Sequence, residues 1–277
     1  MLVILINVFP RTDPLQPHAS SRMSCYLNLG VVSIFRLVHE VKLAQAERVS
    51  GADKFEEEIV KWREMSYAHA FSRGDYDVCV PNWAVRWLEQ TTQAFNGTNK
   101  ASFDVDDMET GRTENEKWNA MQLYLIRTGE LHNNVRMTWG KQIVQWGANL
   151  NHGESSPAEN IMKTLVFLND RFALDGLSPP SYAGLLWCIG WCDKPDAKGR
   201  ISSKPASRYK VGPEAFQQAE SLLLSVHSAR ATSIRTQPSI ISSLKKQGSK
   251  RKDQTEDGNS PAQKNAKTLD MYFRKKP

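Results

Sequence analysis

Apolar residues recur at spacings of three and four along most of this sequence, and this periodicity constrains the fold more than any other feature. It runs from about residue 20 to residue 230 with few alternating runs of the strand type, and it predicts an all-α domain. Loops rich in Gly, Asp, Ser and Lys are expected at 96–114 and 193–212. Helices are expected at 24–47, 53–73, 81–95, 115–129, 132–147, 158–173, 181–191 and 213–229.

Composition divides the chain into one globular part and a basic tail. Its 277 residues, 40% of them hydrophobic, supply enough apolar mass for one core, which is expected over 18–230. Residues 1–17 are expected to be a linker or remnant, because their apolar run is too short to span a bilayer and no basic residue precedes it. A disordered tail is expected over 231–277, and residues 245–277 carry ten Lys or Arg against four Asp or Glu. We therefore expect an intracellular protein with no membrane partner.

The cysteines are expected to be reduced thiols rather than parts of disulfides or metal sites. Cys25, Cys79, Cys188 and Cys192 show no disulfide-like spacing, and the last two lack the second ligand pair of a zinc site. No metal is expected.

Two tryptophans share one helical face in the run 131–146, LHNNVRMTWGKQIVQW. Trp139 and Trp146 are seven residues apart, about two helical turns, and Trp118 precedes them in the sequence WNAMQ. These residues resemble the photolyase and cryptochrome family, most closely the class II cyclobutane-dimer photolyases and their cryptochrome-like relatives. The resemblance implies a helical FAD-binding domain in which electrons pass to the flavin in the order Trp146, Trp118, Trp139.

The same two motifs imply further contacts to the cofactor and substrate. Asn119 follows Trp118 in the WNAMQ motif and is expected to neighbour the flavin or the substrate. The resemblance places His132, Asn133 and Arg136 at the cofactor and Met137 at the substrate.

A phosphate site is expected where the first helix begins. Hydroxyl groups and free backbone amides at a helix start can bind a pyrophosphate, assisted by the helix dipole. The run SSRMSCYLNLGVVS resembles the family signature that holds the FAD phosphates, although Cys25 stands where the family has proline. The matching cofactor residues are Ser20, Ser21, Arg22, Met23 and Ser24.

The helix containing FEEEIVKWREM resembles a family helix that contacts both substrate and cofactor. By position, Glu58 is expected to hydrogen-bond the damaged pyrimidine, Trp62 to pack on it, and Arg63 to help bind the cofactor. The resemblance thus implies that Glu58 is a catalytic residue that stabilises the dimer anion.

The segment LNDRFALDG at 168–176 resembles a family segment beside the flavin ring. Asn169 is expected at flavin N5. A buried Arg136 needs an anionic partner, and the sequence leaves open whether Asp170 or Asp175 pairs with it while the other approaches the ring.

The resemblance weakens after this segment. The family sequence Asp-Pro-Asn-Gly-Tyr is replaced by residues 178–182, SPPSY, although Trp187 matches a ring that stacks on the extruded dimer. The next family loop carries an Arg and a Trp that fill the gap in the duplex, whereas this chain has DKPD, with Lys194 as the expected substrate contact. The loss of the aromatic wedge puts duplex binding in question.

The tail carries signals of a different kind. Its basic clusters, KK at 245–246 and KRK at 250–252, are typical of nuclear import. The end of the chain resembles a sliding-clamp-binding peptide, with Leu269, Tyr272 and Phe273 as the apolar plug and Ala266 in place of the usual glutamine.

The preferred hypothesis is a nuclear, FAD-dependent photolyase-like enzyme that splits pyrimidine dimers in DNA by blue-light-driven electron transfer. The alternatives are a cryptochrome-like photoreceptor and a degenerate flavin domain that acts as a clamp-tethered DNA-binding protein. The resemblance covers about 18–195 and does not include the family's amino-terminal antenna domain.

Overall fold

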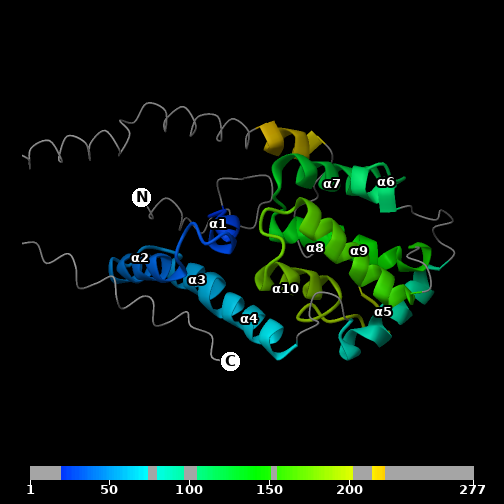
Figure 1. Cartoon of the computed structure of the whole chain (residues 1–277), viewed down its shortest axis with the longest axis horizontal. Coiled ribbons are helices and arrows are strands. Elements are labelled where there is room, and N and C mark those ends of the chain that lie inside the picture. Colours follow the sequence, from blue (N-terminus) through cyan, green and yellow to red (C-terminus); the bar gives the residue numbers. More distant parts are fainter. Residues whose placement is uncertain (1–19, 74–79, 97–104, 151–154, 202–213, 222–277) are drawn as a thin grey trace, which may run out of the picture. The chain divides into compact units, whose positions relative to one another are not determined.

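The computed structural model describes residues 20–73, 80–96, 105–150, 155–201 and 214–221. This part of the chain is helical and contains no β-strand, which confirms the all-α prediction (Figure 1). Its α-helices are α1 (Ser24–Asn28), α2 (Ile34–Ala46), α3 (Ala52–Glu56), α4 (Trp62–Ser72), α5 (Asn82–Phe95), α6 (Val105–Thr110), α7 (Glu116–Thr128), α8 (Asn133–Gln145), α9 (Pro157–Phe172) and α10 (Pro179–Cys188). A π-helix, η3 (Glu57–Lys61), joins α3 to α4, and a short 3₁₀ helix, η4 (Gly147–Asn149), follows α8. Residues 214–221 form a further helical segment.

One helix prediction and one loop prediction need correction. The helix expected at 24–47 is broken into α1 and α2, because Gly30 adopts a positive φ of 68° and the Val31 amide donates to the Tyr26 oxygen. The loop expected at 96–114 contains α6. This helix has one buried apolar residue, Met108, and therefore too little periodicity to be recognised in the sequence.

Side-chain caps fix where several core helices begin. Ser156 and Glu159 form a capping box at α9, with Pro157 in the first turn. Asn115 accepts from the Trp118 amide at the start of α7, and Ser178 accepts from the Ser181 amide at α10. These caps are local in sequence, which explains why the starts of the three helices were predicted to within a few residues.

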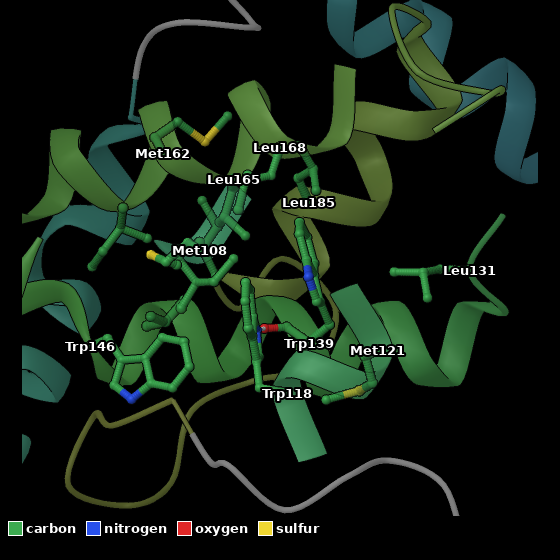
Figure 2. Close-up of a cluster of buried hydrophobic side chains, with 14 of the residues drawn as sticks. Met108, Trp118, Met121, Leu131, Trp139, Trp146, Met162, Leu165, Leu168 and Leu185 are labelled. Atoms are coloured by element: carbon green, nitrogen blue, oxygen red, sulfur yellow. Dashed lines mark hydrogen bonds between the residues drawn. The ribbon is translucent and has the colours of Figure 1, made fainter. Parts of the chain in front are cut away.

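The main apolar core lies among α5, α7, α8, α9 and α10. Figure 2 shows that Leu165, Leu168 and Leu185 pack beside the tryptophans Trp118 and Trp139. Burying each leucine contributes roughly 1.5–3 kcal/mol. A smaller cluster of Leu37, Val41 and Ile59 joins α2 to η3.

Helix α10 packs against α4 on one side and α8 on another, and so connects the amino-terminal helices to the core. Its contact with α8 is close at Gly140, where a Cβ atom would overlap the Sγ atom of Cys188. Among the described helices, none is both long and apolar enough to traverse a bilayer.

Candidate functional site

Three buried tryptophans form a continuous stack in the core. The ring centroids of Trp118 and Trp139 are 6.2 Å apart with planes 10° from parallel, and those of Trp118 and Trp146 are 5.2 Å apart in an edge arrangement. Figure 2 shows Trp118 between the other two rings. The structure therefore brings together the three residues predicted to form a relay, with Trp118 in the middle.

Hydrogen bonds fix the orientation of two of these rings. The indole N–H of Trp118 donates to the Trp139 backbone oxygen at 3.1 Å, and the indole N–H of Trp139 donates to Gln122 Oε1 at 2.9 Å. Gln122 is fully buried, and its Nε2 donates to the Glu109 oxygen at 3.2 Å. The sequence analysis did not select Gln122, although its position one turn after Trp118 was the available signal.

Trp146 lies at the end of the stack, but it is not at the surface. Its exposed fraction is 2%, close to the 0% of Trp118 and the 1% of Trp139. The residue expected to be outermost therefore ends the stack while still covered by protein.

A polar network surrounds Arg136, one helical turn before Trp139 on α8. Arg136 pairs with Asp175, with 2.7 Å between Nη2 and Oδ1, and its Nη1 donates to Ser181 Oγ at 3.0 Å and to Asn169 Oδ1 at 3.4 Å. All four side chains come from different elements: α8, α9, the turn after α9, and α10. The structure thus decides between the two candidate aspartates in favour of Asp175 as the partner of Arg136.

Asp170 has a different set of partners. Its Oδ2 accepts from the Tyr182 hydroxyl at 2.7 Å, and its Oδ1 accepts from Asn169 Nδ2 and the Leu177 amide, each at 3.0 Å. These bonds orient the carboxamide of Asn169, because its nitrogen faces Asp170 while its oxygen faces Arg136. The sequence analysis missed Ser181, whose hydroxyl links Arg136 to Asn169.

The start of α1 is joined to this region by two side chains. Arg22, in a left-handed conformation with φ of 54°, makes a bidentate pair with Glu130 at 2.7 and 2.6 Å. Asn28 Nδ2 donates to the Gly176 oxygen at 2.8 Å. Since Glu130 lies just before α8 and Gly176 lies beside Asp175, the predicted phosphate segment is placed next to the Arg136 network.

Several predicted cofactor residues have other structural roles. The Asn119 amide is bonded to Thr113, with its oxygen accepting from the Thr113 amide at 2.9 Å, and so holds the turn before α7. Arg63 donates to the Tyr67 hydroxyl at 3.2 Å. His132 caps α8 by accepting from the Asn134 amide. Ser20, Ser24 and Asn133 are exposed, whereas Ser21 and Met23 are partly buried.

The expected substrate residues lie at several positions, and two of them contact each other. Trp62 on α4 and Trp187 on α10 make an edge contact, with 5.5 Å between centroids. Glu58, 41% exposed, pairs with Lys54 at 3.2 Å, and Met137 is buried on α8. Lys194 lies 5.5 Å from the ring centroid of Trp87 on α5.

Burial also raises the pKa of a nearby thiol, that of Cys188 on α10. Burial raises the pKa of Cys188 to about 12, and its Sγ contacts the backbone oxygens of Gly184 and Arg136. The thiol is therefore protonated at neutral pH. No group of three or more potential metal ligands occurs among the described residues.

The donor set of the Arg136 network suits a flavin dinucleotide. Two guanidinium groups, those of Arg22 and Arg136, match a pyrophosphate or a ring carbonyl, and the Asn169 amide matches a ring nitrogen. Both guanidinium groups already contact carboxylates, so a bound anion would share them. A separate hollow of about 360 Å³ lies between α7 and 214–221 and is lined by Asn119, Tyr124 and Phe216.

Comparison of the amino-acid sequence with known proteins places this chain in a family. No protein-family model matches the chain. It is similar to the deoxyribodipyrimidine photo-lyase of Oryza sativa subsp. japonica, with 30% identity over 192 residues, which make up 67% of this chain and 36% of the rice protein. The chain is a distant member of the photolyase family.

Other photolyases from distant organisms show the same level of similarity. The deoxyribodipyrimidine photo-lyase of Potorous tridactylus is 31% identical over 184 residues, 64% of this chain and 32% of the relative. That of Methanothermobacter thermautotrophicus is 30% identical over 196 residues, with 70% and 40% covered. This photolyase-family chain thus spans about two-fifths or less of the length of these relatives. The predicted resemblance is confirmed, and the roles of individual residues stay predictions.

Proposed function

We propose that this chain binds FAD and splits cyclobutane pyrimidine dimers in DNA by blue-light-driven electron transfer. The observation that supports the proposal is that the tryptophan stack and the Arg136 network lie close together on α8. The tryptophan stack ends at Trp139, and the Arg136 network lies one helical turn away. A redox cofactor held by the network would therefore adjoin the inner end of the stack.

In this proposal, Arg22 and Arg136 bind anionic or carbonyl groups of the cofactor, and Asn169 orients toward the ring. FAD bound in its reduced form and excited by blue light would supply one electron to the dimer and regain it once the two carbon-carbon bonds between the pyrimidines have split. Asp175 holds Arg136 in position through the 2.7 Å ion pair. Asp170 and Tyr182 fix the carboxamide of Asn169 by the bonds described above.

The stacked tryptophans would relay electrons from an external reductant in solution to the oxidised cofactor, which reduces it before the first repair. Transfer in the order Trp146, Trp118, Trp139 uses only adjacent rings, with centroid separations of 5.2 and 6.2 Å. Gln122 holds the last ring in place through its indole N–H. The dry surroundings of all three rings reduce the reorganisation of solvent around a transient charge.

The dimer would lie against Trp62 and Trp187, with Glu58 as a hydrogen-bond partner and Met137 and Lys194 as further contacts. Trp62 and Trp187 come from helices α4 and α10, which pack on each other. Their edge contact creates one aromatic surface from two distant segments, against which a pyrimidine ring of the dimer would pack.

The test is purification in darkness, an absorption spectrum, and an assay of dimer loss from an irradiated oligonucleotide with and without blue light. The proposal predicts a flavin spectrum and light-dependent dimer loss. A spectrum without flavin after incubation with FAD contradicts the cofactor assignment. Bound flavin with no dimer loss contradicts repair alone.

A cryptochrome-like photoreceptor is the second candidate, and one observation favours it. The Glu58 carboxylate is paired with Lys54, and the two substrate tryptophans contact each other, so these groups are engaged within the protein. The photoreceptor proposal predicts photoreduction of bound flavin without repair. Light-dependent dimer loss in the same assay excludes it.

The tail adds two proposals about location and partners. Its basic clusters support nuclear localisation, and Leu269, Tyr272 and Phe273 support binding to a sliding clamp; both calls lie outside the described residues. A degenerate flavin domain tethered to the clamp predicts clamp binding by the full chain and no bound flavin. Measuring clamp binding of Phe273→Ala against the parent chain tests the tail assignment.

A further inference from the structure

Five of the eight tryptophans lie outside the buried stack and are partly exposed. They belong to α4, α5, α10 and the residues just after α10. These five are Trp62, Trp83, Trp87, Trp187 and Trp191.

Ring contacts and closeness in the sequence connect these five tryptophans into one row, which we name the tryptophan row. Trp62 meets Trp187, and Trp191 lies 5.7 Å from the ring of His69, so α4 and the end of α10 are joined twice. On α5, Trp83 and Trp87 lie 5.6 Å apart. The Trp87 ring packs on Gly190, the residue before Trp191, where an added Cβ would lie 2.9 Å from the ring. The row therefore runs from α4 across the end of α10 to α5.

Cationic side chains lie on the row at two points. The ammonium group of Lys61 is 5.3 Å from the Trp62 centroid, and that of Lys194 is 5.5 Å from the Trp87 centroid. The exposed Lys194 has no ion pair with a described residue. Its charge is therefore available to an anionic partner.

The segment carrying Lys194 is fastened to the protein at several points. Asp193 pairs with the buried ammonium of Lys141, Asp196 pairs with Arg200 at 2.8 Å, and the Ile201 amide donates to Thr91 Oγ1 at 2.8 Å. This segment, 192–201, thus packs on α5 and α8. From 192 to 200 its side chains are small, charged or proline, so none is a large apolar group that could fill a gap in a duplex.

We infer that the tryptophan row is a binding track for unpaired, single-stranded DNA that flanks the damaged bases. The inference rests on the proposed function, because the row begins at Trp62 and Trp187, the proposed dimer site. Single-stranded bases stack on exposed aromatic faces while cations contact the phosphates. Bases in a duplex are already stacked on each other, and this chain offers no described wedge to replace that stacking. The natural substrate class is therefore a lesion in unpaired DNA.

The experiment measures binding in darkness, by fluorescence anisotropy, of the full chain to undamaged oligothymidine of about 12 nucleotides and to its duplex with oligoadenine. Lys194→Gln removes one charge without touching the core, and Trp87→Phe keeps an aromatic ring while shrinking the stacking face. Matched controls are Lys117→Gln on the exposed face of α7 and Phe35→Ala, an 85% exposed ring on α2.

The expected result is tighter binding of the single strand than of the duplex. Trp87→Phe should weaken single-strand binding by about five-fold or more, and Lys194→Gln should reduce the salt slope by about 0.7. Both controls should bind as the parent chain does. Equal losses in the controls would show that the basic tail or general charge carries the binding, and this overturns the inference.

Parent-like binding by both row variants also overturns it, and so does equal affinity for the duplex. If the row binds a protein or peptide and not DNA, the row variants would bind the single strand as the parent chain does. Since the probe has no lesion and the assay uses no light, its outcome is independent of repair. If the parent chain binds single-stranded DNA through the tryptophan row but repairs no dimers, the proposed function is wrong and the inferred DNA-binding track is still supported.

Discussion

The Trp118 and Trp139 rings stack with planes only 10° apart, and the indole N–H of Trp118 donates to the backbone oxygen of Trp139. The pair joins α7 to α8 by both ring contact and hydrogen bond. Because the hydrogen bond orients the Trp118 ring, which Trp146 also contacts, all three rings are held in a defined arrangement. Rigid spacing between rings is what an electron relay needs, and it is also a strong packing element in the core.

Replacing Trp139 with Phe should slow photoreduction of bound flavin while leaving flavin content unchanged. It also leaves Gln122 Oε1 buried without its indole donor, which should lower the free energy of unfolding by about 1–3 kcal/mol. Photoreduction is followed by absorbance under blue light, and stability by urea denaturation. The control Tyr124→Phe alters a buried aromatic residue on α7 that lies outside the stack. If Trp139→Phe photoreduces as fast as this control, the relay assignment is wrong.

Asp175→Asn should destabilise the fold by about 3 kcal/mol, because it leaves the Arg136 guanidinium, 9% exposed, without an anionic partner. The same change should weaken flavin binding, since Arg136 would no longer be held in place. Asp196→Asn breaks an exposed pair with Arg200 and should lower stability much less, because water screens exposed charges. If the two substitutions lower the urea midpoint equally, the buried Arg136–Asp175 pair is no more important for stability than the exposed Arg200–Asp196 pair, and the prediction is wrong.

Gly140→Ala should push α8 away from α10, because the new Cβ overlaps Cys188 Sγ. The expected loss of stability is about 1–3 kcal/mol. In a Cys188→Ala background the loss should be smaller, since the overlapping atom is gone. Gly184→Ala is the control, because its Cβ would meet only Arg136 Cδ at 3.6 Å. Thermal melting of the single variants and of the double variant Gly140→Ala/Cys188→Ala measures the energetic coupling between positions 140 and 188. If Gly140→Ala destabilises the Cys188→Ala background as much as it destabilises the parent chain, overlap with Cys188 Sγ is not the cause.

Stability should fall as the pH rises above about 9. Burial raises the pKa of the Cys188 thiol from 9.0 to about 12, and burial raises the pKa of the Tyr124 hydroxyl from 10.0 to about 12. Above these lower values the unfolded chain releases protons that the folded chain keeps, so the stabilisation is complete below pH 9 and declines toward pH 12. Each group contributes a slope of about 1.4 kcal/mol per pH unit within its window.

Urea denaturation at pH 8 and pH 10 measures this decline. Cys188→Ala should reduce the difference between the two pH values, whereas Tyr124→Phe should change it less, because the tyrosine window begins at pH 10. A Cys188→Ala variant with the same pH difference as the parent chain would show that this thiol does not control alkaline stability.

Local patterns in the sequence were sufficient for most of the helices. The caps at Ser156 and Ser178 and the prolines at 157 and 179 lie within a few residues of the helices they start. Helix α6 was missed because its stability depends on Met108 reaching a core made by other helices. The break at Gly30 was missed because the apolar spacing continues across it.

The sequence by itself determined the helical class, the seven-residue spacing of Trp139 and Trp146, and the resemblance that the comparisons confirmed. These depend on residues close together in the chain. Only the tertiary structure decided that Asp175 pairs with Arg136, that Gln122 holds Trp139, and that the segment with Lys194 packs on α5. Such choices join residues that lie 17 to more than 100 positions apart in the chain. Burial makes an unpaired polar group costly, so packing of the whole domain selects each partner.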